Sequence, residues 1–498
     1  MTAATDIIGA AEAEICRPWL RHILSHTEWV NLANAAFAET WILLAQWADT
    51  IQAHALFLVP ETLTIIPVST VVEGGRYPAL SPAFPGAAWY ERMVRDLWGH
   101  EADGSGNARP WLDHGSWPQS HPMSARPGPR SAIDPHTLLD AGREDLMSLP
   151  LGPVWGQLDE AAHLRLTLTG SIIDQAEGLL GFAHKGTLAL MRGKSPRAAA
   201  RFAARLSADA TVAHSVAFAR ATELALDVAA PPRASALRVV MWVTERIAGH
   251  LDNLAEVGRL VDARALHIKC GYLREILLRA TDLAFGHRLM MDCVVPGGLA
   301  IDIARGGSVV LLRALGEITS AMASIQQSHE GGGLQSRLTG LGCAGEHLVT
   351  ALGAGGVVGR ASGRPFDARA AFVMDYANLA PHIGILTTGD AAARQRQRIF
   401  EIGESLRLIG LALQSLPDGP ITVALPQVSG EGIACAESIR GDVWHWLRLD
   451  HGQIAAVFAR DSGWALWPVA EQVLRNAEAE DVHLIRASFA LPVSGMDL

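Results

Sequence analysis

The sequence has few cysteines, and none of them form a metal-binding pair. The five cysteines among 498 residues are Cys16, Cys270, Cys293, Cys343 and Cys435, and no two have CxxC spacing. Disulfide frameworks and iron-sulfur or zinc sites both need closely and regularly spaced cysteines. The sequence therefore predicts no disulfide framework and no metal cluster in this chain, and the thiols are interpreted as scattered buried side chains.

A long uninterrupted apolar run is also missing. A membrane-spanning helix needs about 20 consecutive apolar residues. The best candidate, residues 29–48, is interrupted by Asn31, Asn34, Glu39 and Gln46. The N-terminus carries Asp6, Glu12 and Glu14 where a signal peptide would have a basic start and an apolar run. We expect a cytoplasmic chain that does not itself span a bilayer.

The chain lacks an excess of positive charge. It has 41 Lys and Arg against 51 Asp and Glu, a net charge of -10, so it offers no basic field for nucleic-acid phosphates. Nucleic acid is excluded as a partner. A hydrophobic content of 49% with only 18% charged residues fits a surface that is partly covered by other subunits.

Residues 99–145 are rich in glycine, proline, serine and histidine and show no helical or strand period. We place a domain boundary there, with a small α/β domain at 1–125, a linker at 126–150 and a larger domain at 151–498. In the small domain, Ala55–Val59 and Leu63–Val72 are predicted strands, and Trp29–Asp49 and Ala88–Leu97 are predicted helices.

The larger domain begins with an alternating strand pattern at His163–Thr169 and continues with long segments of helical period. The predicted helices are Pro196–Leu206, Thr211–Leu226, Ala236–Leu260, His267–Ala284, Gly307–Gln326 and Ala391–Leu416. Near the end, Val443–Leu449 and Gln453–Arg460 flank a short turn with Gly452 and predict a β-hairpin. The expected class is α+β, with a helical bundle and peripheral hairpins.

Two stretches carry a family resemblance. Ala87–Met123 resembles the signature of the complex I 30-kDa subunit, through Glu91, Arg92, Asp96, Leu97, Gly99, Trp117, Pro118, His121 and Pro122. From residue 152 onward, the segments GFAHKG, VAHSVAFARATE, ERIAGHLDNLAEV and GRASG resemble the complex I 49-kDa subunit. They are more similar still to the large subunit of formate hydrogenlyase and hydrogenase-4 type [NiFe] hydrogenases, in which the same two modules are fused in this order.

The resemblance implies a metal site whose ligands are absent. In the hydrogenases of this family, two CxxC pairs supply four thiolates to nickel and iron. The aligned positions here are Ser207, Ala210, Pro492 and Gly495, of which only serine has a side-chain donor. A conventional nickel-iron centre is therefore not expected. Because both pairs bind one metal site, residues 205–212 and 490–498 are predicted to meet in space.

Arg360 and His163 are the candidate catalytic residues. The resemblance places Arg360, in GRASG, beside the active cavity, where its guanidinium could hold an anionic group; a structural ion pair is the alternative. His163 matches approximately the histidine beside quinone in complex I and follows Asp159 and Glu160, so it is a candidate proton donor; a solvated hairpin histidine is the alternative. The matching tyrosine position is Ala208, which leaves quinone open as a ligand.

Other polar residues have simpler interpretations. His184 and His214 lie in matched segments, but isolated histidines in apolar surroundings more often bond to a backbone carbonyl than perform chemistry. Glu245, Arg246, His250 and Asp252 have helical spacing and could relay protons. A solvated face with ordinary salt bridges is the interpretation we favour for that row.

The resemblance implies a subunit of a membrane-associated, energy-converting oxidoreductase complex in NAD(P)H- or quinone-type electron transfer. The chain would hold no cofactor, and an iron-sulfur cluster would lie in a partner subunit. Expected partners are a small iron-sulfur subunit, a ferredoxin-like subunit and antiporter-like membrane subunits, on the cytoplasmic side of the inner membrane. The alternatives are a catalytically inactive scaffold and, third, a hydrogenase with unconventional ligands.

Overall fold

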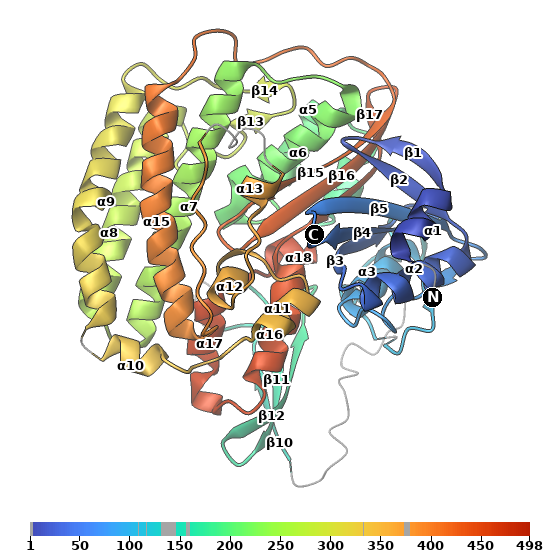
Figure 1. Cartoon of the computed structure of the whole chain (residues 1–498), viewed down its shortest axis with the longest axis horizontal. Helices are drawn as coiled ribbons and strands as arrows, with labels where there is room; N and C mark the ends of the chain where they lie inside the picture. Colours follow the sequence, from blue (N-terminus) through green and yellow to red (C-terminus); the bar gives the residue numbers. More distant parts are fainter. Residues whose placement is uncertain are drawn as a thin grey trace.

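The computed structural model describes residues 3–107, 109–115, 117–130, 146–155, 160–331, 333–372 and 379–498. A sheet domain formed by the first part of the chain lies beside a bundle of long helices, and long strands from the end of the chain run between them (Figure 1). The α+β class predicted from the sequence is confirmed.

The N-terminal domain is built on a five-stranded sheet. Its order is β1 (Glu12–Cys16), β2 (Trp19–Leu24), β5 (Thr64–Val71), β4 (Gln52–Val59) and β3 (Ile42–Ala48). Only the β2 and β5 pair is parallel. The helices of this domain are α1 (Ala4–Ala10), α2 (His26–Ala38) and α3 (Ala87–Trp98). The two predicted strands correspond to β4 and β5, and the predicted helix Ala88–Leu97 to α3.

The predicted helix Trp29–Asp49 is wrong in its second half. Helix α2 ends at Ala38, Thr40 has a φ of 59°, and the chain continues as β3. Every residue of β3 is buried, because α3 and the strands of the larger domain cover it. A short run that is apolar on both faces has no period that separates strand from helix, so the pattern was ambiguous.

The larger domain opens with the antiparallel strands β10 (Met147–Leu151), β11 (His163–Thr169) and β12 (Ile172–Leu179). The first, β10, begins inside the segment predicted as a linker, most of which lies outside the described residues. The long helices that follow are α5 (Pro196–Ala203), α6 (Thr211–Leu226), α7 (Pro232–Leu260), α8 (Arg264–Phe285), α9 (Gly307–Glu330) and α15 (Ala391–Gln414). They correspond to the six predicted helices.

A second antiparallel sheet lies against α6. It contains β15 (Gly430–Glu437), β16 (Asp442–Asp450) and β17 (Gln453–Arg460), and the last two form the predicted hairpin. The shorter elements are α4 (Thr187–Met191), β6 (Arg76–Pro78), β7 (Glu101–Asp103), β8 (Gln119–Ser120), β9 (Gly128–Pro129), β13 (Val294–Val295), β14 (Gly298–Leu299), α10 (Leu334–Leu338), α11 (Glu346–Ala351), α12 (Gly356–Ala361), α13 (Ala368–Ala371), α16 (Gly463–Leu474), α17 (Val482–Phe489) and α18 (Ser494–Asp497), with one-turn helices at Ala208–Ala210 and Ala479–Asp481.

The two domains share one core. Trp47 of β3 stacks on Phe458 of β17, with ring centroids 5.2 Å apart, and lies 5.5 Å from Trp446 of β16. Buried ion pairs join the same surfaces, including Arg21 with Glu431 at 2.7 Å. The N-terminal sheet is therefore fixed to the strands that reach the centre of the larger domain.

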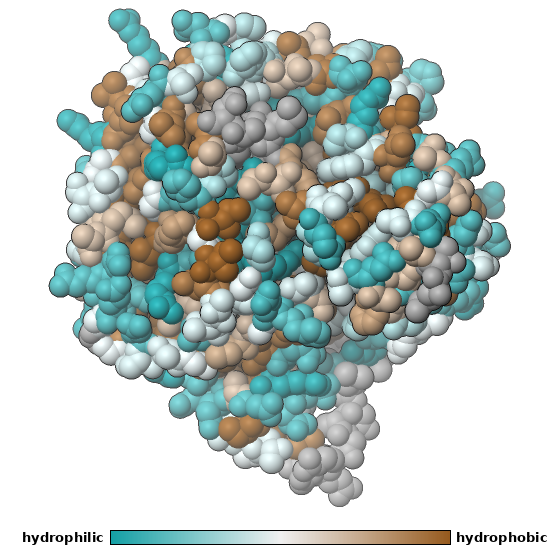
Figure 2. Space-filling view, in the orientation of Figure 1, coloured by the Kyte–Doolittle hydropathy of each residue, from teal (hydrophilic) through white to brown (hydrophobic). Residues whose placement is uncertain are grey.

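Helix α9 is more apolar than its sequence pattern suggested. Within the described residues it is the one helix long and apolar enough to cross a membrane, by length and composition alone, and 28% of its most apolar window is buried. It lies at the outer edge of the bundle beside α8 (Figure 1). On the face shown in Figure 2, apolar residues form several separate areas among hydrophilic ones.

Candidate functional site

Two segments almost three hundred residues apart meet at the centre of the molecule. The Lys185 ammonium donates to the Leu206 carbonyl at 3.2 Å and to the Ser494 carbonyl at 3.0 Å. Arg440 spans the same gap, because it pairs with Asp209 and donates to the Ala490 carbonyl. These contacts confirm the predicted meeting of residues 205–212 and 490–498.

The space beside Gly495 is occupied by a carboxylate. A Cβ atom on Gly495 would stand 2.5 Å from Oδ2 of Asp461, far inside van der Waals contact. Asp461 is completely buried and is held there by the backbone N–H of Gly463 at 2.8 Å. A cysteine side chain at position 495 has no room unless Asp461 moves. A four-thiolate centre therefore fits this chain neither in its residue types nor in the space available.

Asp461 is the end of a buried chain of three side chains. His214 of α6 hydrogen-bonds with Asp461 through Nε2 and with Nε2 of His445, on β16, through Nδ1; both distances are 3.0 Å. All three side chains have no exposed surface. The proton in the hydrogen bond between the rings is donated by one ring nitrogen and accepted by the other, and its transfer moves one unit of charge from ring to ring. The arrangement can hold or shift one proton.

The environment sets the charges in this chain. Burial acts to raise the pKa of Asp461, but the hydrogen bond and charge of His214 and the charge of Arg440 outweigh it and lower the pKa to about 2. Burial, together with the charge of His214, holds the pKa of His445 well below its ordinary value. Asp461 is thus ionised and His445 neutral at physiological pH, and the His214 ring lies between them.

Further ionisable groups surround the meeting point. Asp497 accepts the backbone N–H groups of Gly181 at 2.8 Å and Ala183 at 2.7 Å, and burial raises its pKa to about 7. Burial also lowers the pKa of Lys185. Glu160 accepts the N–H of Ser494 at 2.8 Å. The position aligned with the metal ligands is therefore bordered by ionisable side chains, of which Asp497 is buried and Lys185 and Glu160 are exposed.

Arg360 lies in a closed ion-pair cluster. The guanidinium, on α12, is completely buried and pairs with Glu401 at 2.8 Å, Glu437 at 2.9 Å and Asp367 at 3.1 Å. Burial and the neighbouring Asp367 raise the pKa of Glu437 to about 7. The structure thus gives Arg360 the internal carboxylate partners of the second interpretation.

His163 lies apart from Arg360. It begins β11, is half-buried, and its Nδ1 atom is 3.3 Å from the Gly152 carbonyl. Asp159, one of the two carboxylates expected beside it, lies outside the described residues. The two candidate catalytic side chains are therefore not brought into one site, and their roles remain predictions.

The favoured interpretation of the charged row on α7 is wrong for three of its four members. Glu245, Arg246 and His250 are buried, and only Asp252 is exposed. Glu245 accepts the backbone N–H groups of Val212 and Ala213 at the start of α6, and burial raises its pKa to about 8. Arg246 pairs with Glu401, which belongs to the Arg360 cluster. The row links the start of α6 to that cluster.

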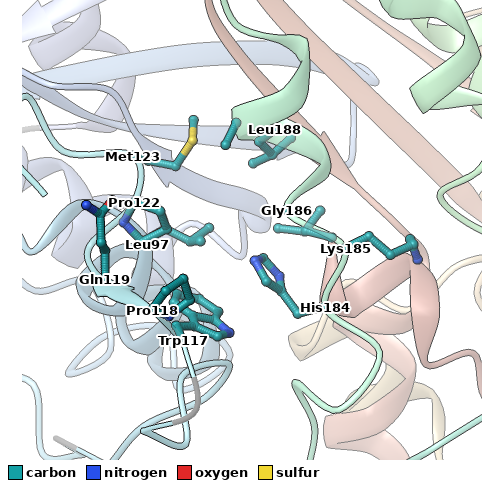
Figure 3. A pocket seen from close by; sticks show the side chains of 12 residues that line it. Leu97, Trp117, Pro118, Gln119, Pro122, Met123, His184, Lys185, Gly186 and Leu188 are labelled. Atoms are coloured by element: carbon teal, nitrogen blue, oxygen red, sulfur yellow. The ribbon is translucent and has the colours of Figure 1, made fainter. Parts of the chain in front are cut away.

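A mainly apolar cavity of about 320 Å³ opens at the junction of the two domains. Figure 3 shows the His184 ring pointing toward Trp117 and Lys185 turned away from it. The His184 and Trp117 rings stack with centroids 4.4 Å apart. Through Nδ1 the His184 ring bonds with the Asp497 carbonyl at 2.5 Å, as the simpler interpretation predicts.

Sequence reasoning missed His445, Asp461, Lys185 and Arg440. Each lies outside the two segments aligned with the metal ligands, and only the fold shows its contact with them. One signal was available. Strand β17, whose last four residues are buried, ends at Arg460 and is followed directly by Asp461, with Gly463 two residues later.

Known families match both parts of the chain. Residues 18–127 match the family described as respiratory-chain NADH dehydrogenase, 30 Kd subunit, and residues 263–431 match the corresponding 49 Kd subunit family. An archaeal respiratory membrane complex, the membrane-bound sulfane sulfur reductase, contains a chain of the same fold. Its TM-score is 0.67 at 22% identity, over 71% of this chain and 99% of that one.

Individual relatives match the chain over more than half of its length. Hydrogenase-4 component G of Escherichia coli (strain K12) is 26% identical over 83% of this chain and 74% of that protein. Formate hydrogenlyase subunit 5 of the same strain is 25% identical over 83% and 75%. An NADH-quinone oxidoreductase subunit of Acidiphilium cryptum (strain JF-5) is 29% identical over 56% and 69%. This chain belongs to the family of fused 30-kDa/49-kDa-type subunits that membrane-bound hydrogenases share with complex I.

Proposed function

We propose that this chain is the large subunit of the peripheral, cytoplasmic arm of an energy-converting oxidoreductase complex, and that it works without a nickel-iron centre. The observation that carries the proposal is the buried chain of Asp461, His214 and His445 beside Gly495. Where relatives with cysteines would bind a metal, this chain has groups that bind and move protons. The chain itself would contain no redox centre.

The proposed role is to couple electron transfer to proton movement. A small iron-sulfur subunit would bring an electron near this position, and the added negative charge favours protonation of nearby groups. Asp497 and Glu437 have pKa values raised to about 7 by burial, and Glu245 to about 8, so they respond near physiological pH. The buried row on α7 extends this response toward the helical bundle. A ferredoxin-like subunit and antiporter-like membrane subunits complete the proposed complex, with NAD(P)H and quinone as the electron carriers.

A scaffold role is the second candidate, and one observation favours it. The space beside Gly495 is filled by Asp461, the space beside Gly463 is filled by Pro492 and Met496, and Arg360 is enclosed by ion pairs. A protein that only holds a complex together needs no opening at this point. The third candidate, a hydrogenase with other ligands, is opposed by the same packing.

One pair of variants separates coupling from scaffolding. Replacing His214 with Gln or Asp461 with Asn keeps side-chain size but interrupts the proton path. Coupling predicts that the purified complex still assembles while electron transfer slows by at least about tenfold and its pH profile shifts. The control is His451→Gln, on an exposed turn where the ring is 86% exposed. If electron-transfer turnover and its pH profile are unchanged in both variants, coupling is contradicted and the scaffold role is supported.

Metal content is a separate test. The complex is expressed with nickel-iron maturation enzymes and excess nickel, and its metals are measured after chelation. Because the aligned positions have no thiolate and no room for one, we expect no stoichiometric nickel. About one nickel per chain that survives chelation would overturn the proposal.

A further inference from the structure

A second cavity lies on the outside of the helical bundle. It has a volume of about 500 Å³ and lies between α9 and α15. The two helices are neighbours in the bundle (Figure 1). One wall is apolar, with Met322, Ile399 and Phe400, and the other carries His329 and Arg396. The volume is within the range of small-molecule sites.

Arg396 differs from the arginines around it. Its neighbours on α15, Arg394 and Arg398, are completely buried and hydrogen-bond to residues of α17. Arg396 is half-buried and lines the cavity, and it has no hydrogen bond or ion pair with any residue that the structure describes. Its Nε atom is buried without a partner. A guanidinium in this position keeps its donors available for a ligand.

His329 is a second polar group of the cavity wall without a hydrogen-bond partner among the described residues. The side chain is completely buried in the cavity wall, and neither ring nitrogen has a hydrogen-bond partner among the described residues. Burial, assisted by the charge of Arg396, lowers its pKa, so the ring is neutral and carries one donor and one acceptor. Leaving buried polar atoms unpaired is unfavourable, so a ligand group that reached them would be stabilised.

Both carboxylates at the rim of the cavity interact with other residues of the chain. Glu404 pairs with Arg407 at 2.5 Å and with His382 at 3.3 Å. Glu330 accepts the Gln326 amide at 2.9 Å. Arg396 forms no ion pair with either of them. Glu330 keeps its negative charge, since a neutral amide does not neutralise it, whereas Glu404 is neutralised by Arg407. The positive charge of Arg396 has no ion-pair partner among the described residues.

We infer that this cavity binds an amphiphilic anion. Arg396 would hold a carboxylate or phosphate with its planar fork, and His329 would donate a second hydrogen bond to the same group once it is seated. The apolar body of the ligand would lie on Met322, Ile399 and Phe400; Phe400 is 41% exposed in the empty cavity. A free fatty acid and the headgroup of an anionic phospholipid share this chemistry. The inference does not depend on the proposed function.

Binding to the purified complex tests the inference. The probes are octanoate, inorganic phosphate, and vesicles of phosphatidylglycerol or of phosphatidylcholine. The variant is Arg396→Gln, which should fold because it removes no hydrogen bond or ion pair with the described residues. The matched control is Arg313→Gln, on the exposed side of α9. We expect Arg396→Gln, but not the control, to weaken anion binding by about tenfold or more.

Comparing octanoate with phospholipid vesicles distinguishes a free fatty acid from a lipid headgroup as the bound anion. Calorimetric binding of octanoate that is lost in Arg396→Gln identifies a free carboxylate. Binding to phosphatidylglycerol vesicles alone, with the same loss, identifies a lipid headgroup. The inference is overturned if neither amphiphile binds, if Arg396→Gln binds as tightly as the parent, or if inorganic phosphate binds as tightly as octanoate, since the apolar wall would then contribute nothing.

Discussion

Single residues decide whether a metal site can exist in this chain. The sequence alone showed that the four aligned positions lack thiols. It could not show that Asp461 occupies the space that a side chain at Gly495 would need, because that contact joins residues on different elements. The roles of His214 and His445 were hidden for the same reason. An isolated histidine pattern does not reveal a partner on a strand more than two hundred residues later.

Restoring the cysteine at position 495 should fail structurally. Gly495→Cys places a Cβ atom 2.5 Å from the buried Asp461 carboxylate, and overpacking of this kind costs about 1–3 kcal/mol. We expect a lower midpoint in chemical denaturation. Gly316→Ala, on the exposed side of α9 with no atom within 4 Å of the new Cβ, is the control and should be neutral or slightly stabilising. Equal stability of Gly495→Cys and the parent would contradict the packing argument.

Glu471 provides a test of pH dependence. It accepts the Gly178 N–H at 2.8 Å through one oxygen, and burial raises its pKa from 4.5 to about 7. Between these values the folded chain holds a proton that the unfolded chain has lost, so this group makes stability fall as pH rises from about 4.5 to about 7. Glu471→Gln keeps the Gly178 bond and cannot titrate.

The expected result for Glu471→Gln is a flatter stability profile. At pH 8 the variant should exceed the parent by about 1–2 kcal/mol, and at pH 4.5 the two should agree. Denaturation midpoints measured across this pH range give both comparisons. A parent and a variant with parallel profiles would show that Glu471 does not hold a proton near neutrality in the folded chain.

At the scale of elements, length and period were good guides for helices and poor guides for buried strands. The predicted bounds of α6 coincide with the observed ones; the helix stops at Asp227, which has a φ of 55°, and Pro231 and Pro232 follow shortly after. The sequence pattern predicts a helix where strand β3 forms, because a strand buried on both faces has no alternation of apolar and polar residues. The buried row on α7 was misjudged because helical spacing alone does not say whether a charged face meets water or another charged face.

Arg440 holds two elements of the site together. It joins Asp209, beside the start of α6, to the turn that precedes α18. Arg440→Leu removes both contacts, and because Asp209 is 40% exposed we expect a loss of only about 1–2 kcal/mol. Backbone amides of residues 490–497 should exchange faster with solvent.

The control for that experiment is Arg475→Leu. This arginine is exposed at the end of α16, so its replacement should change neither stability nor exchange. Faster exchange of residues 490–497 in both variants would show that the segment opens for reasons unrelated to Arg440.

At the scale of the whole molecule, the resemblance to two families anticipated the order of the domains but not their junction. Trp446 lies 5.5 Å from Trp47, and its indole N–H donates to Glu431 at 2.9 Å. Trp47 lies on β3 and Glu431 and Trp446 lie on β15 and β16, and no local sequence motif indicates that these strands meet. The junction is a product of the folded arrangement, and the sequence pattern of either domain alone does not predict it.

Weakening the packing at this junction should lower the stability of the whole chain. Trp446→Ala removes a fully buried ring, and such changes cost about 3–5 kcal/mol. We expect a lower denaturation midpoint and easier proteolysis between the domains. Phe37→Ala, on α2 where the ring is 58% exposed, should stay within about 0.5 kcal/mol of the parent. Loss of the N-terminal domain's fold alone in Trp446→Ala would show that the domains are not one cooperative unit.

Covalent fusion changes what this junction must achieve. When two domains are joined in one chain, their association is intramolecular, and the effective concentration set by the connecting segment replaces the concentration of free partners. Dilution cannot separate them. The junction can therefore include a costly buried pair such as Arg21 with Glu431, and a fixed one-to-one ratio of the domains is guaranteed at synthesis, before any other subunit arrives.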